Sequence, residues 1–354
     1  MNVLFKYVGV ALAFWVGCGS ANEKKTEATP QPESVTIESV ASHDHQWTGI
    51  AVGADGSLIL NLPTWSDDVP ISVGVWTHES LQPFPTEDWN GVAGDSESGF
   101  ICVQSVYTDD QGNLWILDPA NPKFEGVVEG GPKLYEFKLG AEKPVRTYSF
   151  PEEVIDPNSY LNDVRIDTDR RMAYLTDSGF GALLTVDLES GEVHRFLADH
   201  PSVKSEVDSL VMSDGSVWRN TVHSDGIALS PDRKWLYYTA LTGHTLYRVP
   251  TDSLSEGVDP STSVEKVADI GATDGMWFGQ DGVLYLGGLE SDAIFTYTEA
   301  AGYQLLVRNP AIRWADSFAE DAEGNVYFTT SQIHLPESRR GAYEVFRIHQ
   351  KKTR

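Results

Sequence analysis

Residues 173–197 read AYLTDSGFGALLTVDLESGEVHRFL, and this stretch decides the fold class. It contains three short runs rich in apolar residues, 173–176, 182–188 and 193–197, with Gly-containing turns between them. Apolar runs of this length that are separated by turn residues are typical of β-strands joined by hairpins. The stretch therefore predicts one small antiparallel sheet.

The beginning of this unit recurs along the chain. Each copy has a short apolar strand, a turn that contains Asp or Gly, and a second strand rich in Leu, Tyr and Trp. Copies spaced by roughly 40 to 60 residues match the blade period of a β-propeller. One such sheet cannot bury both of its faces, so we expect an all-β, six-bladed β-propeller in which the sheets stack around an axis. The six copies begin at residues 47–52, 103–107, 162–166, 225–232, 274–278 and 316–320.

Two segments at the ends of the repeats complement each other. The last copy has no evident outermost strand after residues 343–348, whereas residues 35–40, VTIESV, alternate like a strand and stand alone before the first copy. We predict that this N-terminal segment closes the sixth blade. The predicted propeller domain spans residues 34–354, and residues 19–33, which lack a large apolar side chain, are predicted to be a flexible tether.

Residues 1–18 resemble an export signal. Lys6 precedes an apolar run over residues 7–16, which is too short to span a bilayer as a permanent helix. The run ends in WVGCGS, residues 15–20, which resembles a bacterial lipobox, so we predict that Cys18 is lipidated. Ordinary signal cleavage nearby is the alternative. We expect an exported protein, either lipid-anchored in the cell envelope or secreted.

The charge and the cysteines exclude several classes of function. The 354 residues carry a formal charge of −26, which repels nucleic acid and anionic lipid, so we expect no nucleic-acid partner and membrane attachment only through the lipid anchor. Cys102 lies in an apolar stretch and is predicted to be a buried, unpaired thiol. The sequence contains no Gly-x-Ser-x-Gly, Cys-x-x-Cys or His-Glu-x-x-His motif and no phosphate-binding loop, which leaves serine hydrolase, zinc and nucleotide functions without support.

Several of the repeated stretches together resemble the major royal jelly/Yellow protein family, as a bacterial member. The resemblance covers most of the chain after the tether. It implies a six-bladed propeller, export, and a central channel that binds small amines in some relatives and is linked to pigment chemistry in others, but it supplies no catalytic residues. The matching stretches are SVY at 105–107, GNLWILD at 112–118, AYLTDS at 173–178, GALLTVD at 181–187 with Arg195 after it, and DGIALSPD at 225–232 before LYY at 236–238.

A more distant resemblance is to the gluconolactonase and senescence-marker-protein propellers, which hold a divalent cation, commonly calcium, at the channel. The positions that match their ligands before the first strand of a blade are Asn162, Asp225 and Asp274. These side chains offer the hard oxygen atoms that calcium prefers. Thr48 stands where those families have a Glu, which weakens the site or removes it. The alternative is that each Asn or Asp caps its own turn.

Other residues are candidates for the channel mouth, each with a structural alternative. His223 lies two residues before Asp225 and is a candidate acid or base, or else a hydrogen-bonded loop histidine. Asp163 and Asp316 would supplement the ligand set or serve only their loops. The candidates for stacking on a planar or cationic ligand, or else for packing between blades, are Trp47, Trp277 and Trp314. Two long connections, 119–131 and 198–222, are predicted to be loops over one end of the ring.

Two functions stay open at this point. The first is a binding protein that holds a small-molecule ligand at the mouth of the central channel. The alternative is a calcium-dependent hydrolase of lactones or related esters, in which the ion polarises a carbonyl group. Isomerisation or oxidation of catechol-like compounds rests on the family resemblance alone.

Overall fold

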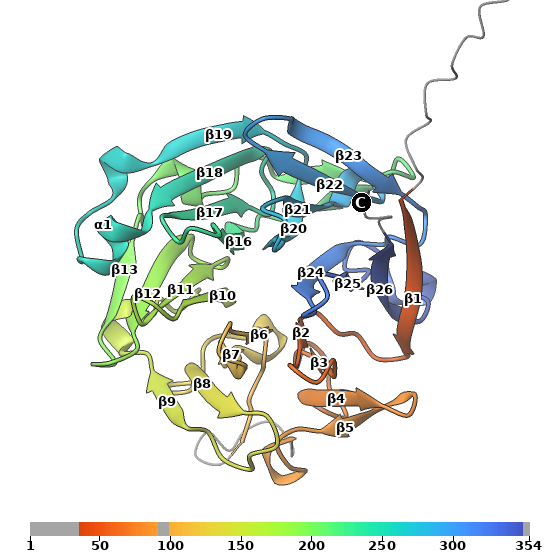
Figure 1. The fold of residues 1–354 in the computed structure, drawn as a ribbon, viewed down its shortest axis with the longest axis horizontal. Coiled ribbons are helices and arrows are strands. Elements are labelled where there is room, and N and C mark those ends of the chain that lie inside the picture. Colours follow the sequence, from red (N-terminus) through yellow and green to blue (C-terminus); the bar gives the residue numbers. More distant parts are fainter. Residues whose placement is uncertain (1–34, 91–98, 350–354) are drawn as a thin grey trace, which may run out of the picture. The chain divides into compact units, whose positions relative to one another are not determined.

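The computed structural model describes residues 35–90 and 99–349, and these residues form a six-bladed β-propeller (Figure 1). Six four-stranded antiparallel sheets stand around a central axis, so the predicted all-β fold and blade number are confirmed. The predicted export signal, the lipidation site Cys18 and the tether lie outside the described residues. Within the described residues, no helix is long and apolar enough to cross a membrane.

The strands of each blade are ordered from the axis outward, as Figure 1 shows. The first blade contains β2 (Ile50–Val52), β3 (Leu58–Asn61), β4 (Val73–Thr77) and β5 (Ser80–Pro83). The second contains β6 (Ser105–Thr108), β7 (Asn113–Asp118), β8 (Lys133–Lys138) and β9 (Arg146–Ser149). The third contains β10 (Leu161–Asp167), β11 (Met172–Asp177), β12 (Ala182–Asp187) and β13 (Val193–Phe196). The last three contain β16 (Ser224–Leu229), β17 (Trp235–Ala240), β18 (Thr245–Pro250) and β19 (Glu265–Asp269); β20 (Thr273–Phe278), β21 (Leu284–Gly288), β22 (Ala293–Thr298) and β23 (Gly302–Arg308); and β24 (Ala315–Glu320), β25 (Val326–Thr330), β26 (Tyr343–His349) and β1 (Thr36–His43).

Short elements lie in the connections between these strands. The long connection between the third and fourth blades contains a hairpin of β14 (Ser209–Val211) and β15 (Val217–Arg219). The described residues contain one α-helix, α1 (Thr251–Ser255), and short 3₁₀ helices at Asp88–Asn90, Pro122–Phe124, Glu152–Val154, Pro201–Val203, Ser261–Ser263, Leu289–Ser291 and Glu337–Arg339.

The N-terminal strand β1 closes the ring, as predicted from its isolated alternating pattern. It pairs antiparallel with β26 and forms the outermost strand of the sixth blade. The carboxylate of Glu38 accepts hydrogen bonds from Arg347 and His349 on that neighbour, each at 2.6 Å. The first and last strands of the ring thus belong to one sheet, so no blade is left incomplete.

The hydrophobic core is divided among the interfaces between blades. Six clusters of buried side chains each draw residues from two neighbouring sheets, such as Ile59 with Leu114 and Ala228 with Met276. Burying one such aliphatic side chain contributes about 1.5–3 kcal/mol. Because each cluster needs both of its blades, the stability of every blade depends on its neighbours.

An acidic residue at the inner turn of three blades fixes the aromatic side chain of the next strand. Asp109 accepts hydrogen bonds from the backbone amides of residues 111 and 113 and from the indole of Trp115. Asp321 binds Tyr327 in the same manner, and Asp281 binds Tyr285. The glycine of each turn has a positive φ, which a residue without Cβ adopts at little cost. The recurring Asp/Gly turns of the sequence therefore anchor the core as well as reversing the chain.

The inner strands of four blades begin with a bulge. The pairing register shifts between the first and fourth residues of β10, β16, β20 and β24, so the residues between them are released from the ladder. A bulge re-aims side chains at a strand end. The glycine after the acid in two of these strands is needed for close approach: a Cβ at Gly226 would lie 2.3 Å from the carbonyl oxygen of Asp274, and one at Gly275 would lie 2.4 Å from that of Asp316. The Asp-Gly pairs thus bring neighbouring inner strands together at the axis.

Candidate functional site

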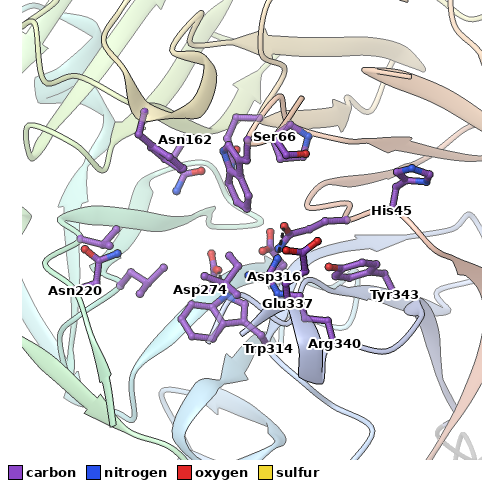
Figure 2. Close-up of a pocket in the computed structure, with 18 of the residues that line it drawn as sticks. His45, Ser66, Asn162, Asn220, Asp274, Trp314, Asp316, Glu337, Arg340 and Tyr343 are labelled. Carbon is purple, nitrogen blue, oxygen red and sulfur yellow. Dashed lines mark hydrogen bonds between the residues drawn. The ribbon is translucent and has the colours of Figure 1, made fainter. Parts of the chain in front are cut away.

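A cavity of about 800 Å³ lies over the axis, at the end of the ring where the inner strands begin. Its lining comes from all six blades and from both long connections that were predicted to be loops over one end of the ring: Phe124 belongs to one, and Trp218 and Asn220 to the other. Figure 2 shows Asp274, Trp314 and Asp316 on one side of the cavity and Asn162 on the other.

The floor of the cavity consists of residues at equivalent positions of five blades. They are Gln104, Asn162, Asp225, Asp274 and Asp316, which all line the cavity and are at most 8 % exposed. The structure thus brings the three predicted ligand positions together and adds Asp316, as proposed from the sequence. Gln104 was missed, although alignment of the second blade with the others places it at the same position.

Thr48 occupies the equivalent position in the first blade but does not line the cavity. Its hydroxyl donates to the carbonyl oxygen of Gln104 at 3.0 Å and accepts from the amide of Asn61 at 2.9 Å, and the residue is fully buried. At this position the first blade therefore contributes a hydrogen bond to the second blade and no charge to the floor.

The acidic side chains of the floor are held in an environment that disfavours their ionised forms. Burial, together with the nearby charge of Asp163, raises the pKa of Asp316 to about 7. Burial and repulsion from the other carboxylates also raise the pKa values of Asp225 and Asp274 well above the usual range. At neutral pH these carboxyls therefore hold protons or need a positive charge nearby.

Hydrogen bonds orient the floor and partly oppose these shifts. The indole of Trp314 donates to Oδ2 of Asp274 at 2.6 Å. Hydrogen bonding of Asp225 to Asp274 and to Asn162 lowers the pKa of Asp225, although burial outweighs it. Two carboxyl groups can share a hydrogen bond only if one of them carries a proton. A shared proton is therefore one way in which the floor can reduce the repulsion between its carboxyl groups.

Below the floor, three side chains close the axis. The guanidinium of Arg165, from the third blade, donates to the carbonyl oxygen of Met276, in the fifth blade, at 2.7 Å. It lies over the rings of Tyr107 and Trp277, with its Cζ 5.4 and 5.9 Å from their centroids. Those two rings come from opposite blades and have centroids 5.9 Å apart, so they meet across the channel. Asp163 lies 3.7 Å from the guanidinium and balances its charge. We call Tyr107, Arg165 and Trp277 the axial plug.

Aromatic side chains form two walls above the floor. On one side, the indole of Trp65 donates to the hydroxyl of Tyr160 at 2.7 Å, and that hydroxyl donates to Oε1 of Gln104 at 2.9 Å. Phe124 stacks on Tyr160 with ring centroids 5.0 Å apart, yet it is 60 % exposed. On the other side, Trp218 packs edge-on against Trp314 at 4.9 Å. The exposed face of Phe124 is available to a ligand, because it already lines the cavity.

Of the remaining sequence candidates, His223, Trp47 and Trp277 lie outside the cavity lining, whereas Trp314 is part of it. Nδ1 of His223 accepts a hydrogen bond from the backbone amide of Ser205, which matches the alternative of a loop histidine. Trp47 is buried in the cluster between the sixth and first blades, and Trp277 belongs to the axial plug; of the three named tryptophans, only Trp314 lines the cavity. Cys102 is a buried free thiol, as predicted, and burial together with the charge of Asp118 raises its pKa to about 12.

The donor atoms of the floor match calcium in kind. Asn162, Asp225, Asp274, Asp316 and Gln104 supply only oxygen ligands and amides, which suit a hard cation. Within the described residues, no three His, Cys, Asp or Glu side chains are grouped in a way that could hold a metal ion. A divalent ion at the floor would therefore depend on amide oxygens as well as carboxylates.

Solved structures with the same fold include enzymes. A gluconolactonase from Xanthomonas campestris superposes with a TM-score of 0.55 over 89 % of each chain, at 12 % sequence identity. The virginiamycin B lyase of Staphylococcus aureus superposes with a TM-score of 0.51 over 90 % of this chain and 100 % of its own, also at 12 % identity. Similarity at this level of identity shows the shared propeller fold and nothing about the reaction.

Sequence comparison is more specific. Major royal jelly protein 3 of Apis mellifera is 25 % identical over 300 residues, which cover 78 % of this chain and 52 % of that protein. Major royal jelly protein 6 of the same species is 26 % identical over 258 residues, which cover 66 % of this chain and 56 % of that protein. The chain thus spans about half the length of these relatives. The major royal jelly protein family pattern matches residues 101–333, a span that includes all five residues of the cavity floor, and the chain belongs to this family.

Proposed function

We propose that the cavity binds a small organic molecule that carries a positive charge next to a flat ring. The observation that carries this proposal is the floor itself, where Asp225, Asp274 and Asp316 are buried side by side without a basic partner among the residues that line the cavity floor. A cation would remove the repulsion between these carboxylates, which is strong where water is scarce.

The walls favour the same class of ligand. The aromatic side chains of Trp65, Phe124 and Trp218 line the cavity. A cation over such a ring gains about 0.5–2 kcal/mol, and a flat ring stacks on it. The overall charge of −26 would also attract a cation toward the cavity.

Calorimetric titration tests this proposal with phenylethylamine and its uncharged analogue phenylethanol. We expect the amine to bind and the alcohol to bind at least tenfold more weakly, since only the amine meets the carboxylates. Asp274→Asn should weaken amine binding about tenfold or more, whereas Glu189→Gln, which removes an exposed charge from a turn, should leave it unchanged. Equal binding of amine and alcohol would refute the proposal.

A second candidate is a calcium-dependent hydrolase of lactones or related esters. It is favoured by the convergence of Asn162, Asp225 and Asp274 at one floor. Calcium bound there would supply a positive charge that polarises a carbonyl group. Metal analysis of the purified protein and its thermal stability with and without added calcium decide this point. Loss of calcium-dependent stabilisation in Asp225→Asn, but not in Glu189→Gln, would favour this candidate over the binding protein.

We further propose that the protein is exported and anchored through a lipid on Cys18. The support is the short apolar run before the lipobox-like residues 15–20. Fractionation of cells that express the full chain should find the protein with membranes. Cys18→Ala should release it, and wild-type protein in the soluble fraction would argue for secretion without an anchor.

A further inference from the structure

Arg340 stands out among the charged residues of the cavity. Of the described residues that line it, Arg340 is the one Lys or Arg, whereas six are Asp or Glu: Asp44, Asp68, Asp225, Asp274, Asp316 and Glu337. Figure 2 shows Arg340 beside Tyr343, on the same side of the cavity as Asp316 and Trp314. It is half-buried, unlike the floor residues.

Two contacts hold the guanidinium in place. Nε donates to the carbonyl oxygen of Leu335 at 2.9 Å, and Nη1 lies 3.4 Å from Oε1 of Gln46. The loop around it is held by Gln332, whose side chain bonds the backbone at Gly341 and at Ala342. The side chain is therefore positioned before any ligand arrives, which lowers the entropy lost on binding.

The charge of Arg340 is not neutralised by the protein. In the part of the chain that the structure describes, no carboxylate lies within 4.0 Å of its guanidinium, and Nη2 has no hydrogen-bond partner. Its neighbour Arg339, by contrast, forms an ion pair with Asp214 at 2.9 Å. A guanidinium with an unpaired charge and a free Nη2 at the edge of a cavity can donate a charge-assisted hydrogen bond to a carboxylate.

The rest of the cavity limits what this group can accept. A ligand with only a negative charge would meet six acidic side chains and one basic one, so it would be repelled overall. A ligand that carries a positive charge for the floor and a negative charge for Arg340 would match both. We infer that the cavity selects zwitterions, with an ammonium group toward Asp225, Asp274 and Asp316 and a carboxylate on Arg340. This inference rests on the proposed cation site and names the second group that its ligand carries.

Three probes that share one ring test the inference by calorimetric titration of the whole protein. They are para-(aminoethyl)benzoate, which carries both charges, phenylethylamine, which carries only the ammonium, and para-ethylbenzoate, which carries only the carboxylate. We expect the zwitterion to bind about tenfold more tightly than the amine, because a charge-assisted bond to a fixed guanidinium adds to the shared contacts. The carboxylate alone should not bind measurably.

Variants then assign the preference to one residue. Arg340→Gln should abolish the tenfold preference while leaving phenylethylamine binding unchanged, and Arg340→Lys should restore part of it. Arg339→Gln, which removes the same charge one residue away, should keep the preference. If the amine binds as tightly as the zwitterion, or if Arg340→Gln keeps the preference, the inference is wrong and the cation site stands. If neither the amine nor the zwitterion binds, the proposed function is wrong, and the inference is wrong with it.

Discussion

The central channel has two levels, which differ in whether their buried charged side chains have partners of opposite charge. At the upper level, Asp225, Asp274 and Asp316 meet without a basic partner at the floor. At the lower level, on the inner strands β6, β10 and β20, Arg165 is balanced by Asp163 and covered by Tyr107 and Trp277. At the lower level, Arg165 has a carboxylate partner and links the third blade to the fifth, although its Nε has no hydrogen-bond partner among the described residues, whereas the carboxyls of the upper level have no basic partner at the floor. Buried charge without a partner is therefore the better guide to the ligand site.

The largest predicted effect is on the pH dependence of stability, and it comes from the carboxyl groups of the upper level. Between about pH 4 and about pH 7, the floor carboxyls keep their protons in the folded protein, whereas the same groups have lost them in the unfolded chain. Their contribution to stability is therefore complete below about pH 4 and is lost as the pH rises through the folded value of about 7 for Asp316. Asp316 alone would account for at most about 4 kcal/mol. Urea unfolding at pH 5 and pH 8 measures how much the free energy of unfolding decreases between these two pH values. The decrease should be smaller for Asp316→Asn than for wild type, and an equal decrease in the two proteins would contradict the prediction.

Breaking the axial plug should cost nearly as much. Arg165→Met leaves the buried carboxylate of Asp163 without its partner, and the expected loss is about 3 kcal/mol in the free energy of unfolding. The double variant Asp163→Asn/Arg165→Met should recover part of it, because no unpaired charge remains. Arg308→Met, at an exposed position of β23, is the matched control. Denaturant unfolding of wild type and the three variants measures these changes. If the double variant is no more stable than Arg165→Met, Asp163 and Arg165 are not coupled.

Removing the indole donor from the upper level should have a moderate effect. Trp314→Phe deletes the hydrogen bond to Asp274 and leaves a small void, at a cost of about 2 kcal/mol. It should also raise the pKa of Asp274 further, so that amine binding weakens most near neutral pH and recovers at higher pH. Titration with phenylethylamine at pH 7 and pH 9 measures this; equal weakening at both values would point to lost packing alone.

The smallest effect is expected for Thr48, the first-blade residue at the position that carries an acidic or amide side chain in the other five blades. Thr48→Val removes a donor to Gln104 and an acceptor for Asn61, at a cost of about 1 kcal/mol. Since Thr48 does not line the cavity, the affinity for phenylethylamine should change less than twofold. A larger change in affinity would mean that the first blade takes part in binding.

Much of the fold could be predicted from local patterns. Blade repeats and the unmatched strand pattern at residues 35–40 were enough to predict six blades and the strand that closes them, because alternation and turn residues are local signals. Asn162, Asp225, Asp274 and Asp316 could be found because they occupy the same position at the start of the inner strand in each repeat. Their role as metal ligands stays a prediction.

The other parts of the site depend on contacts that no local pattern encodes. Arg165 reaches across the axis to Met276, in a blade that is not its neighbour, and nothing in the run Val164-Arg165-Ile166 indicates this. Phe124 lines the cavity from a loop residue with φ of 57°, a conformation that propensity does not predict. Arg340 was missed for a related reason, since its free charge becomes visible only beside the acidic lining.

The pairing of β1 with β26 has a consequence for the order of folding. Residues 36–43 must find partners at 343–349, a separation of almost the whole chain, and such distant contacts form slowly. The sixth blade cannot be complete until its last strand has been synthesised, whereas the third blade, which is contiguous in sequence, can form earlier. Until then the free edge of β26 is open to pairing with other chains. Closing of the ring is thus a late step that requires both β1 and β26.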